Sequence, residues 1–303
     1  MLRFSNVIMS IKSSIKARDF TSLLLTYCLA VQCVLSPLVW AQDSEPYIQI
    51  DTSRSPTVQH HESLNGVDVI DIATPHNSGL SENYFRAYSV PDTGVIVNNN
   101  TELNNPSQLG GIVNPNRNLQ QTGPASTILF DVTGTDRTQL NGMTEIHGGA
   151  ANFILSNPNG ISVNGGAFYN APRVTLTTGE PIVNANQLTG FVVNDGRITI
   201  DSQGLITRSN DRDVNVTAVD LLARSIELNG EIYAPDLTLV TGRNEVAYDD
   251  IAGAIIPLDL DETGKPQFAI DSSQLWGMYA NAIRLVSTEQ GVGVRFRAPV
   301  AAG

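Results

Sequence analysis

The segment ANFILSNPNGISV, residues 151–163, places two short β-patterned runs on either side of Asn157-Pro158-Asn159-Gly160. Phe153 to Leu155 lead into this motif, and Ile161 and Val163 follow it. A residue before proline is disfavoured in the α conformation, and an Asn-Gly pair tolerates positive φ well. The segment therefore predicts a tight corner between two short strands.

Alternation of apolar and polar residues dominates the chain, and helical periodicity is scarce. In one recurrent theme, two apolar residues flank a polar one and a glycine follows within a few residues. Its instances are Val174/Leu176, Ile198/Ile200, Ile226/Leu228, Leu237/Leu239 and Ile283/Leu285. Many short strands are compatible with a sandwich, a barrel or a β-solenoid. The abundance of asparagine favours the solenoid, because asparagine tolerates corner conformations and can stack in ladders between coils.

Several ordered motifs resemble the two-partner secretion domain, the N-terminal module of filamentous-haemagglutinin-type and haemolysin-type exoproteins of Gram-negative bacteria. The opening signature of that family resembles GLSENYFRAYSVPDTGVIVNNN, residues 79–100. The first Asn-Pro-Asn signature resembles QLGGIVNPNRNL, residues 108–119, and the second resembles residues 151–179. The closing signature resembles MYANAIRLVSTEQGVGV, residues 278–294.

The resemblance implies an all-β fold, a right-handed parallel β-helix with an N-terminal cap and extra-helical β-hairpins. Residues 47–58 with 67–72 are expected to form the cap, and residues 255–270 to lie outside the coils. The first motif departs from the family's usual Asn-Pro-Asn-Leu, because Arg117 follows Asn116 and the leucine stands at Leu119. Either two residues are inserted or the leucine is replaced. The transport signal is assigned to Asn114, Pro115, Asn116, Leu119, Asn157, Pro158, Asn159 and Gly160.

The first 41 residues are predicted to be a cleaved signal peptide. Basic residues at positions 3, 12, 16 and 18 precede the apolar stretch Leu23–Leu35. The sequence Val39-Trp40-Ala41 then places the cleavage between Ala41 and Gln42. A transmembrane anchor is disfavoured, because the apolar run is too short to span a bilayer and polar residues interrupt it.

The positions of the cysteines and the net charge limit the disulfides and the binding partners expected of the mature chain. Both cysteines, Cys28 and Cys33, lie in the leader, so no disulfide is expected after cleavage. That is consistent with passage of an unfolded chain through a narrow outer-membrane pore. Removal of the leader, with four basic residues and one acid, takes the net charge from −12 to −15. An acidic chain without a basic cluster is a poor candidate for binding nucleic acid or anionic lipid.

Candidate chemical sites are weak. His60-His61-Glu62 lacks a further His or Cys cluster at zinc-like spacing, so an exposed polar turn is expected there. Asp259 to Gly264 resembles the start of a Ca²⁺ loop, but Ile270 stands where the loop needs glutamate, which favours a hairpin turn. Polysaccharide lyases on β-helices use clustered carboxylates and a basic residue, which Asp211-Arg212-Asp213, or Asp249-Asp250 with Arg243, would have to supply.

The resulting interpretation is a non-enzymatic secretion module over residues 42–295, with residues 296–303 beginning a downstream region. By resemblance, a monomeric chain without cofactor or metal enters the periplasm through the Sec translocon. POTRA domains of an outer-membrane TpsB-type β-barrel transporter then recognise it, and it is secreted or displayed on the cell surface. Adhesins, haemolysins and contact-dependent inhibition toxins share this module. The alternative is a secreted polysaccharide-active β-helix enzyme.

Overall fold

Strands form and stack in almost every part of the chain that the structure describes. This computed structural model describes residues 47–207, 215–258, 264–272, 277–297 and 300–302. The predicted signal peptide and its cleavage site between Ala41 and Gln42 lie outside these residues, as do Asp211, Arg212 and Asp213 and most of the turn after Asp259. The helical content of the described residues is a single 3₁₀ turn, η1 (Arg117–Leu119), and none of their helices is long and apolar enough to cross a membrane.

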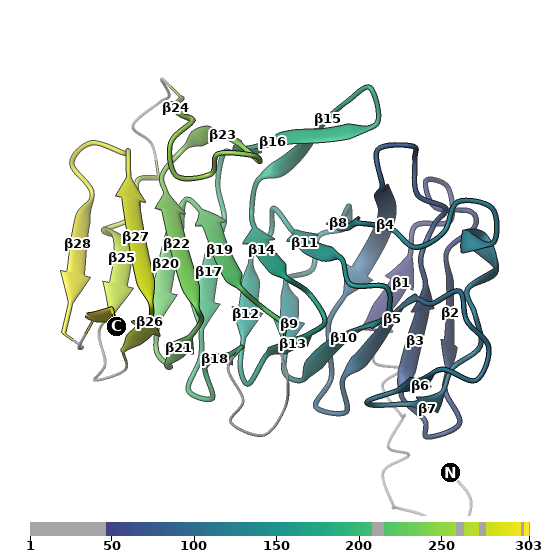
Figure 1. The fold of residues 1–303 in the computed structure, drawn as a ribbon. Coiled ribbons are helices and arrows are strands. Elements are labelled where there is room, and N and C mark those ends of the chain that lie inside the picture. Colours follow the sequence, from purple (N-terminus) through teal and green to yellow (C-terminus); the bar gives the residue numbers. More distant parts are fainter. Residues whose placement is uncertain (1–46, 208–214, 259–263, 273–276, 298–299, 303) are drawn as a thin grey trace, which may run out of the picture. The chain divides into compact units, whose positions relative to one another are not determined.

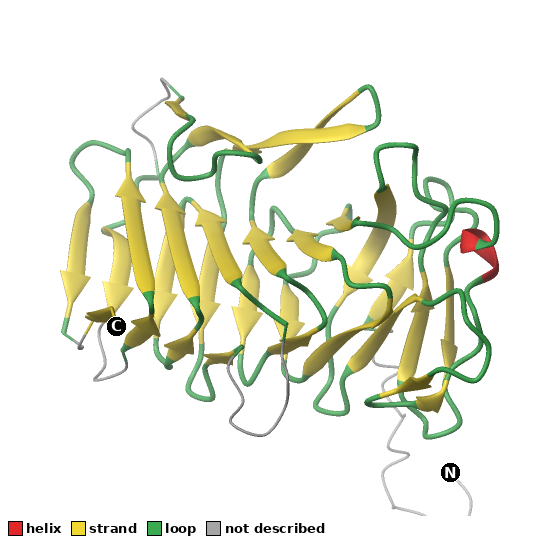
Figure 2. Ribbon diagram, in the orientation of Figure 1, coloured by secondary structure: helices red, strands yellow, loops and turns green. Residues whose placement is uncertain are grey.

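The strands wind into a right-handed parallel β-helix, which confirms the predicted fold (Figure 1). Each full coil contributes one strand to each of three sheets, and each sheet extends along the stack from coil to coil (Figure 2). Short strands joined by tight turns form this path. Inward side chains alternate with outward ones along each strand, so one set of side chains faces the interior of the coils. In Figure 1 the chain rises on the near face and descends on the far face while it advances from purple to yellow.

The first sheet contains β1 (Ile48–Ile50), β4 (Leu80–Tyr88), β8 (Thr127–Val132), β11 (Asn152–Ser156), β14 (Arg173–Thr177), β19 (Ala218–Ala223), β22 (Asp236–Thr241) and β27 (Ala282–Ser287). The second sheet contains β9 (Thr138–Leu140), β12 (Ile161–Val163), β17 (Arg197–Ile200), β20 (Ser225–Leu228), β25 (Phe268–Ser272) and β28 (Gly293–Phe296). From β4 onward, all pairs within the first sheet are parallel, as are all pairs within the second.

The third sheet has two parts that a bridge between Gly166 and Leu205 joins. One part contains β2 (Gln59–Glu62), β3 (Asp68–Asp71), β5 (Val95–Asn99), β10 (Met143–Gly148) and β13 (Ala167–Tyr169). The other contains β18 (Leu205–Ile206), β21 (Ile232–Tyr233), β26 (Met278–Ala280) and β29 (Val300–Ala302). The coils therefore continue through β28 and β29 to Ala302.

The core is a continuous apolar column inside the coils. Phe85, Phe130 and Phe153 come from successive strands of the first sheet, and their ring centroids lie 4.7 and 5.2 Å apart. Phe168 packs on Phe153 at 5.8 Å from the third sheet. Such aromatic pairs add about 0.5–1.5 kcal/mol each to the free energy of burial. The residues of the recurrent sequence theme lie on coil strands, and all are buried except Ile283 and Leu285 in the last coil.

The N-terminal cap is formed by the two segments predicted for it together with β2, which lies between them and was not predicted. Strand β1 pairs antiparallel with β4, and β2 pairs antiparallel with β3. His60-His61-Glu62 therefore belongs to an exposed strand rather than to the exposed turn expected from the sequence. The hairpin pairs His60 with Asp68 at 2.6 Å and His61 with Asp71 at 3.6 Å, which fixes both side chains across two strands.

A separate sheet, which is antiparallel, lies outside the coils. It contains β15 (Glu180–Asn184), β16 (Gln187–Val193), β23 (Asn244–Ala247) and β24 (Ile255–Pro257) in that order. Its Phe191 and Val246 pack on outward residues of the first sheet, among them Leu129 and Ile154. We call it the covering sheet. The expected excursion at 255–270 is thus confirmed for β24, whereas β25 has already returned to the coils, and the hairpin at 180–193 was not predicted.

Candidate functional site

The Asn157-Pro158-Asn159-Gly160 corner joins β11 to β12, as the sequence predicts. Asn157 is fully buried, and its amide nitrogen donates to the Asp136 carbonyl at 2.9 Å and to Thr138 Oγ1 at 3.0 Å. Both acceptors belong to the preceding coil. Its Oδ1 accepts the Asn159 backbone N–H at 2.9 Å, which closes a local turn. One buried side chain therefore shapes the corner and fastens it to the coil below.

Gly160 completes the corner with a φ of +108°. A Cβ at this position would lie 2.8 Å from the Arg197 carbonyl oxygen of the next coil. Glycine is therefore required both by the backbone conformation and by the close approach of another coil. Asn159 is not among the described residues with positive φ, so Gly160 alone of the Asn-Gly pair adopts this conformation. Asn159 is exposed, but its amide donates to the Gly134 carbonyl at 2.7 Å.

Arg137 fastens the same corner from the neighbouring coil. Its Nη2 donates to the Ile161 carbonyl at 3.1 Å, the Arg197 carbonyl at 3.3 Å and Thr199 Oγ1 at 2.6 Å. Burial lowers the pKa of the Arg137 guanidinium below its usual range, and the nearby charge of Arg197 lowers it further. The guanidinium thus joins three successive coils beside Gly160, a contact that the sequence motif does not reveal.

The first motif forms its turn two residues later than the sequence suggests. Asn116 is buried, and its amide donates to the carbonyls of Ile72 and Asn98, both at 3.0 Å. Its Oδ1 accepts the Asn118 N–H at 2.9 Å. Asn116-Arg117-Asn118 therefore repeats the hydrogen bonding of Asn157-Pro158-Asn159. Asn114 is exposed and Pro115 half-buried, so they do not form the equivalent turn.

This register explains the departure at Arg117. The 3₁₀ turn η1 begins at Arg117 and places Leu119, which is fully buried, in the core. The sequence Asn116-Arg117-Asn118-Leu119 thus occupies the place of Asn-Pro-Asn-Leu, with arginine at the proline position. The structure does not bring the two motifs together, since Asn116 binds the ends of β3 and β5 while Asn157 lies between β11 and β12.

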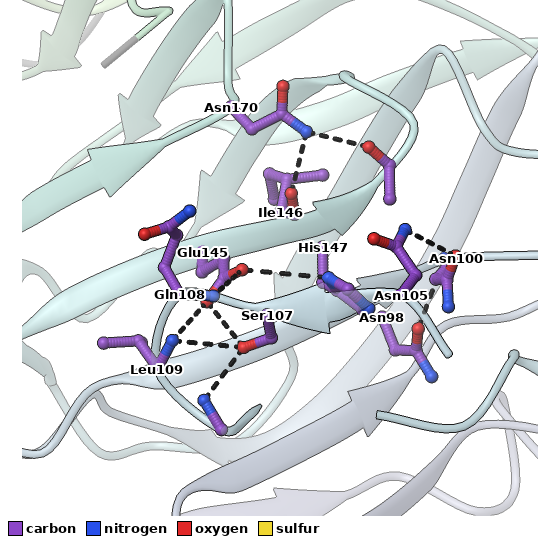
Figure 3. A network of polar contacts seen from close by, with 12 residues as sticks. Asn98, Asn100, Asn105, Ser107, Gln108, Leu109, Glu145, Ile146, His147 and Asn170 are labelled. Carbon is purple, nitrogen blue, oxygen red and sulfur yellow. Dashed lines mark hydrogen bonds and ion pairs between the residues drawn. The ribbon is translucent and has the colours of Figure 1, made fainter. Parts of the chain in front are cut away.

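A buried polar cluster holds the long segment that carries the first motif (Figure 3). Glu145 lies on the outward face of β10, and its carboxylate accepts from Ser107 Oγ at 2.9 Å and from the N–H groups of Gln108 at 2.8 Å and Leu109 at 2.9 Å. These donors belong to the hairpin of β6 (Pro106–Ser107) and β7 (Gly111–Ile112) and to its turn. Glu145 therefore fastens the β6–β7 hairpin over the third sheet.

His147 lies two residues further along β10 and is only 3% exposed. Burial lowers the pKa of its imidazole from the usual 6.5, and the charge of Glu145 opposes that shift. The His147 Nδ1 lies 3.8 Å from the Glu145 carboxylate, and its Nε2 has no hydrogen-bond partner within the described part of the chain. Sequence reasoning missed both residues, because outward positions on a strand are ordinarily exposed to solvent.

The candidate chemical sites within the described part of the chain do not assemble into a centre. Among the described residues, no group of three or more His, Cys, Asp or Glu side chains is placed to hold a metal ion. Asp249 and Asp250 are exposed, and Asp250 accepts the Gly253 N–H at 3.1 Å within its own loop. Arg243 donates to the Asn194 carbonyl at 2.8 Å. The second cluster, Asp211 to Asp213, lies outside the described residues.

One family model, that of the TPS secretion domain, matches residues 48–302. The chain belongs to the TPS secretion domain family. A solved structure of a filamentous hemagglutinin secretion domain superposes with a TM-score of 0.70 and 32% sequence identity, covering 81% of each chain. The resemblance inferred from the motifs is confirmed.

Several curated relatives of this chain are CdiA proteins. The 16S rRNA endonuclease CdiA of Enterobacter cloacae subsp. cloacae is 42% identical over 266 residues, which is 88% of this chain and 8% of the relative. The tRNA nuclease CdiA of Escherichia coli O6:K15:H31 is 39% identical over 276 residues, 91% of this chain and again 8% of the relative. The chain thus spans less than a tenth of the length of these relatives. TPS-domain exoproteins of this kind are secreted or displayed at the cell surface, and a TPS domain implies a transporter partner.

Proposed function

We propose that this chain is the N-terminal secretion module of a large exoprotein and has no enzymatic activity of its own. The observation that carries the proposal is a TPS fold over residues 48–302 in which both asparagine corners are built. The nuclease names of the CdiA relatives describe whole proteins of which this chain matches about 8%. The same module would serve an adhesin, a haemolysin or an inhibition toxin, so the proposal is limited to export.

The proposed route has three steps. The leader, residues 1–41, directs the chain through the Sec translocon and is cleaved between Ala41 and Gln42. POTRA domains of a TpsB-type transporter bind the unfolded module as a monomer and pass it through the outer membrane. Unfolded β-forming segments have free backbone groups, and pairing with the edge of a partner sheet is a known mode of peptide recognition. The absence of cysteine after residue 33 suits this route.

Outside the cell, the module folds and offers its last coil as a template. Leu285, Val294 and Val300 point inward in that coil but are 38%, 48% and 45% exposed. Their partners in the preceding coil, Leu239, Ile270 and Met278, are at most 1% exposed. Further coils stacked on this end would bury the exposed side chains and pair the open strand edges.

The corner residues are proposed to act in export through folding. The set comprises Asn114, Pro115, Asn116, Leu119, Asn157, Pro158, Asn159 and Gly160. Within it, the hydrogen bonds favour Asn116 and Asn157 as the two residues on which corner formation depends. If folding at the surface helps to draw the chain outward, a defective corner slows export.

Export can be tested by expressing the full chain with and without a TpsB-type transporter from the same locus. The proposal predicts mature protein, beginning at Gln42, in the culture supernatant or on the surface only when the transporter is present. Deletion of the POTRA domains should retain the protein in the periplasm. Equal export without the transporter would contradict the proposal, and so would polysaccharide cleavage by the purified protein, which would favour the rival enzyme.

A further inference from the structure

The Asn159–Gly160 peptide bond can take part in a reaction, deamidation, that plays no role in export. Asparagine followed by glycine deamidates spontaneously, because glycine has no side chain to shield its backbone nitrogen. The Gly160 nitrogen loses its proton and attacks Asn159 Cγ, so that an N–Cγ bond forms, the Cγ–Nδ2 bond breaks and the amide leaves as ammonia. Water then opens the resulting succinimide on either side and leaves aspartate or isoaspartate at position 159.

In the folded domain both reacting groups are held in place. The Asn159 amide nitrogen donates to the Gly134 carbonyl at 2.7 Å and to Asn157 Oδ1 at 3.1 Å. The Gly160 N–H donates to the Asn157 carbonyl at 3.0 Å. The reaction requires that these hydrogen bonds break and that the backbone at Gly160 rotates. The close approach of the Arg197 carbonyl to Gly160 opposes that rotation. We propose that Asn159 is a deamidation site of the unfolded chain and that folding closes it.

Asn65-Gly66 provides an internal comparison. It lies in the turn between β2 and β3, where Asn65 is exposed and its amide makes one long hydrogen bond of 3.4 Å to the Leu109 carbonyl. Nothing lies within 4 Å of the position that a Gly66 Cβ would occupy. The Gly66 N–H donates to the Ser63 carbonyl at 3.0 Å, as the Gly160 N–H does to the Asn157 carbonyl, so the two sites differ in the hydrogen bonds of the amide and in the packing of the glycine. Folding therefore restrains Asn65 less than Asn159, and the Asn65 site is expected to stay reactive in the folded domain.

Deamidation at position 159 would damage the corner. An aspartate there would direct carboxylate oxygens at the Gly134 carbonyl and at Asn157 Oδ1, both of which are acceptors. Two hydrogen bonds would become repulsive contacts, and isoaspartate would add a backbone atom to a tight turn. The proposed route exports the chain unfolded. On that route, the fraction of chains deamidated at Asn159 would increase with the time that a chain stays unfolded before it folds outside the cell.

The test compares wild-type mature protein incubated in buffer and in concentrated urea at mildly alkaline pH. Peptide mapping by mass spectrometry follows deamidation at Asn159 and Asn65 over time. In urea the two sites should react at similar rates, whereas in buffer the Asn159 rate should fall by about tenfold or more, because reaction requires local opening. Equal Asn159 rates in buffer and urea, or no reaction at Asn159 in urea while Asn65 reacts, would overturn the proposal.

The consequence is tested with Asn159→Asp and the matched Asn65→Asp. Asn159→Asp should lower the urea midpoint of unfolding and slow export, and Asn65→Asp should change neither. Equal effects of the two variants would contradict the proposed damage. The rate comparison uses purified protein and no transporter, so its outcome is independent of whether the export proposal holds.

Discussion

At the scale of single residues, buried asparagine amides hold the coils together. Asn157 and Asn116 each accept a backbone N–H two residues ahead and donate to carbonyls of strands or loops far away in the sequence. Asn99 also uses both ends of its amide: its Oδ1 accepts the backbone N–H of Ala125, 26 residues away, and its Nδ2 donates to the Gly149 carbonyl. Asparagine suits these positions because its side chain is both donor and acceptor, whereas aspartate supplies only acceptors.

Truncation of a buried corner asparagine is therefore expected to be costly. Asn157→Ala and Asn116→Ala should each lower the free energy of unfolding by about 1–3 kcal/mol, because buried backbone groups lose their partners. The exposed Asn114 is the matched control, and Asn114→Ala should stay within about 0.5 kcal/mol of wild type. Urea denaturation measures all three. A larger loss for Asn114→Ala than for Asn116→Ala would show that the turn does not begin at Asn116.

The shifted register also predicts where proline is accepted. Asn116 has φ −70° and ψ 118°, an extended conformation that a following proline favours. Arg117 is the first residue of the turn, so Arg117→Pro should be neutral or stabilise by about 0.4–1 kcal/mol. Asn118→Pro removes the N–H that Asn116 Oδ1 accepts and should destabilise. Thermal unfolding of the pair checks this, and a stable Asn118→Pro beside an unstable Arg117→Pro would refute the register.

Burial of His147 predicts a pH dependence with a definite sign. The folded domain lowers the pKa of His147 below 6.5, so the unfolded chain takes up the proton first as the pH falls. Stability should therefore decline as the pH drops through 6.5, by up to about 1.4 kcal/mol per pH unit. Urea unfolding across this range should show a shallower decline in His147→Gln than in wild type. An unchanged pH profile in His147→Gln would exclude His147 as the cause, and His61→Gln on exposed β2 is the control.

At the scale of elements, the covering sheet makes the outer face of the first sheet a second core. Phe191, Val193 and Val246 bury Leu129 and Ile154, which would otherwise point to solvent. Both edge strands carry a proline, Pro181 in β15 and Pro257 in β24, and β15 also pairs with a register shift. Prolines and bulges at an edge oppose pairing with further strands, which keeps this sheet from extending.

Loss of Phe191 should detach this sheet before the coils unfold. Phe191→Ala empties a fully buried site and is expected to cost about 3–5 kcal/mol. Limited proteolysis should then cut within residues 180–193 while the coil strands stay protected. Ile256, 61% exposed on β24, is the control, and Ile256→Ala should change little. Simultaneous cleavage of coils and hairpin would show that the two layers unfold as one unit.

At the scale of the whole described domain, a capped first coil and an open last coil give the stack a direction. The antiparallel β1 and β2 close the N-terminal end, whereas β27, β28 and β29 leave inward apolar side chains exposed. The asymmetry fits a module that folds first and then receives further coils on its open end. This order of folding is part of the proposed function.

The sequence predicted the coil strands, the cap and the β11–β12 corner, because each depends on local alternation and turn residues. It could not predict the hairpin at 180–193, since alternating strands look alike whether they pair within a coil or across its outer face. The register at Arg117 was hidden because Asn114-Pro115-Asn116 and Asn116-Arg117-Asn118 differ only in which asparagine is buried. Glu145 and His147 were missed because a distant loop, not their own strand, buries them.

The most direct test of the account is the secretion of two glycine variants with the transporter co-expressed. Gly160 and Gly264 both have positive φ, +108° and +69°, at which valine costs about 1–3 kcal/mol. Only Gly160 packs closely against another coil, since a Cβ at Gly264 would meet nothing nearer than 3.7 Å. Gly160→Val should lower the amount in the culture supernatant and accumulate in the periplasm, while Gly264→Val should be secreted nearly as wild type. Secretion of both variants at the wild-type level would contradict the claim that the Asn157–Gly160 corner serves export.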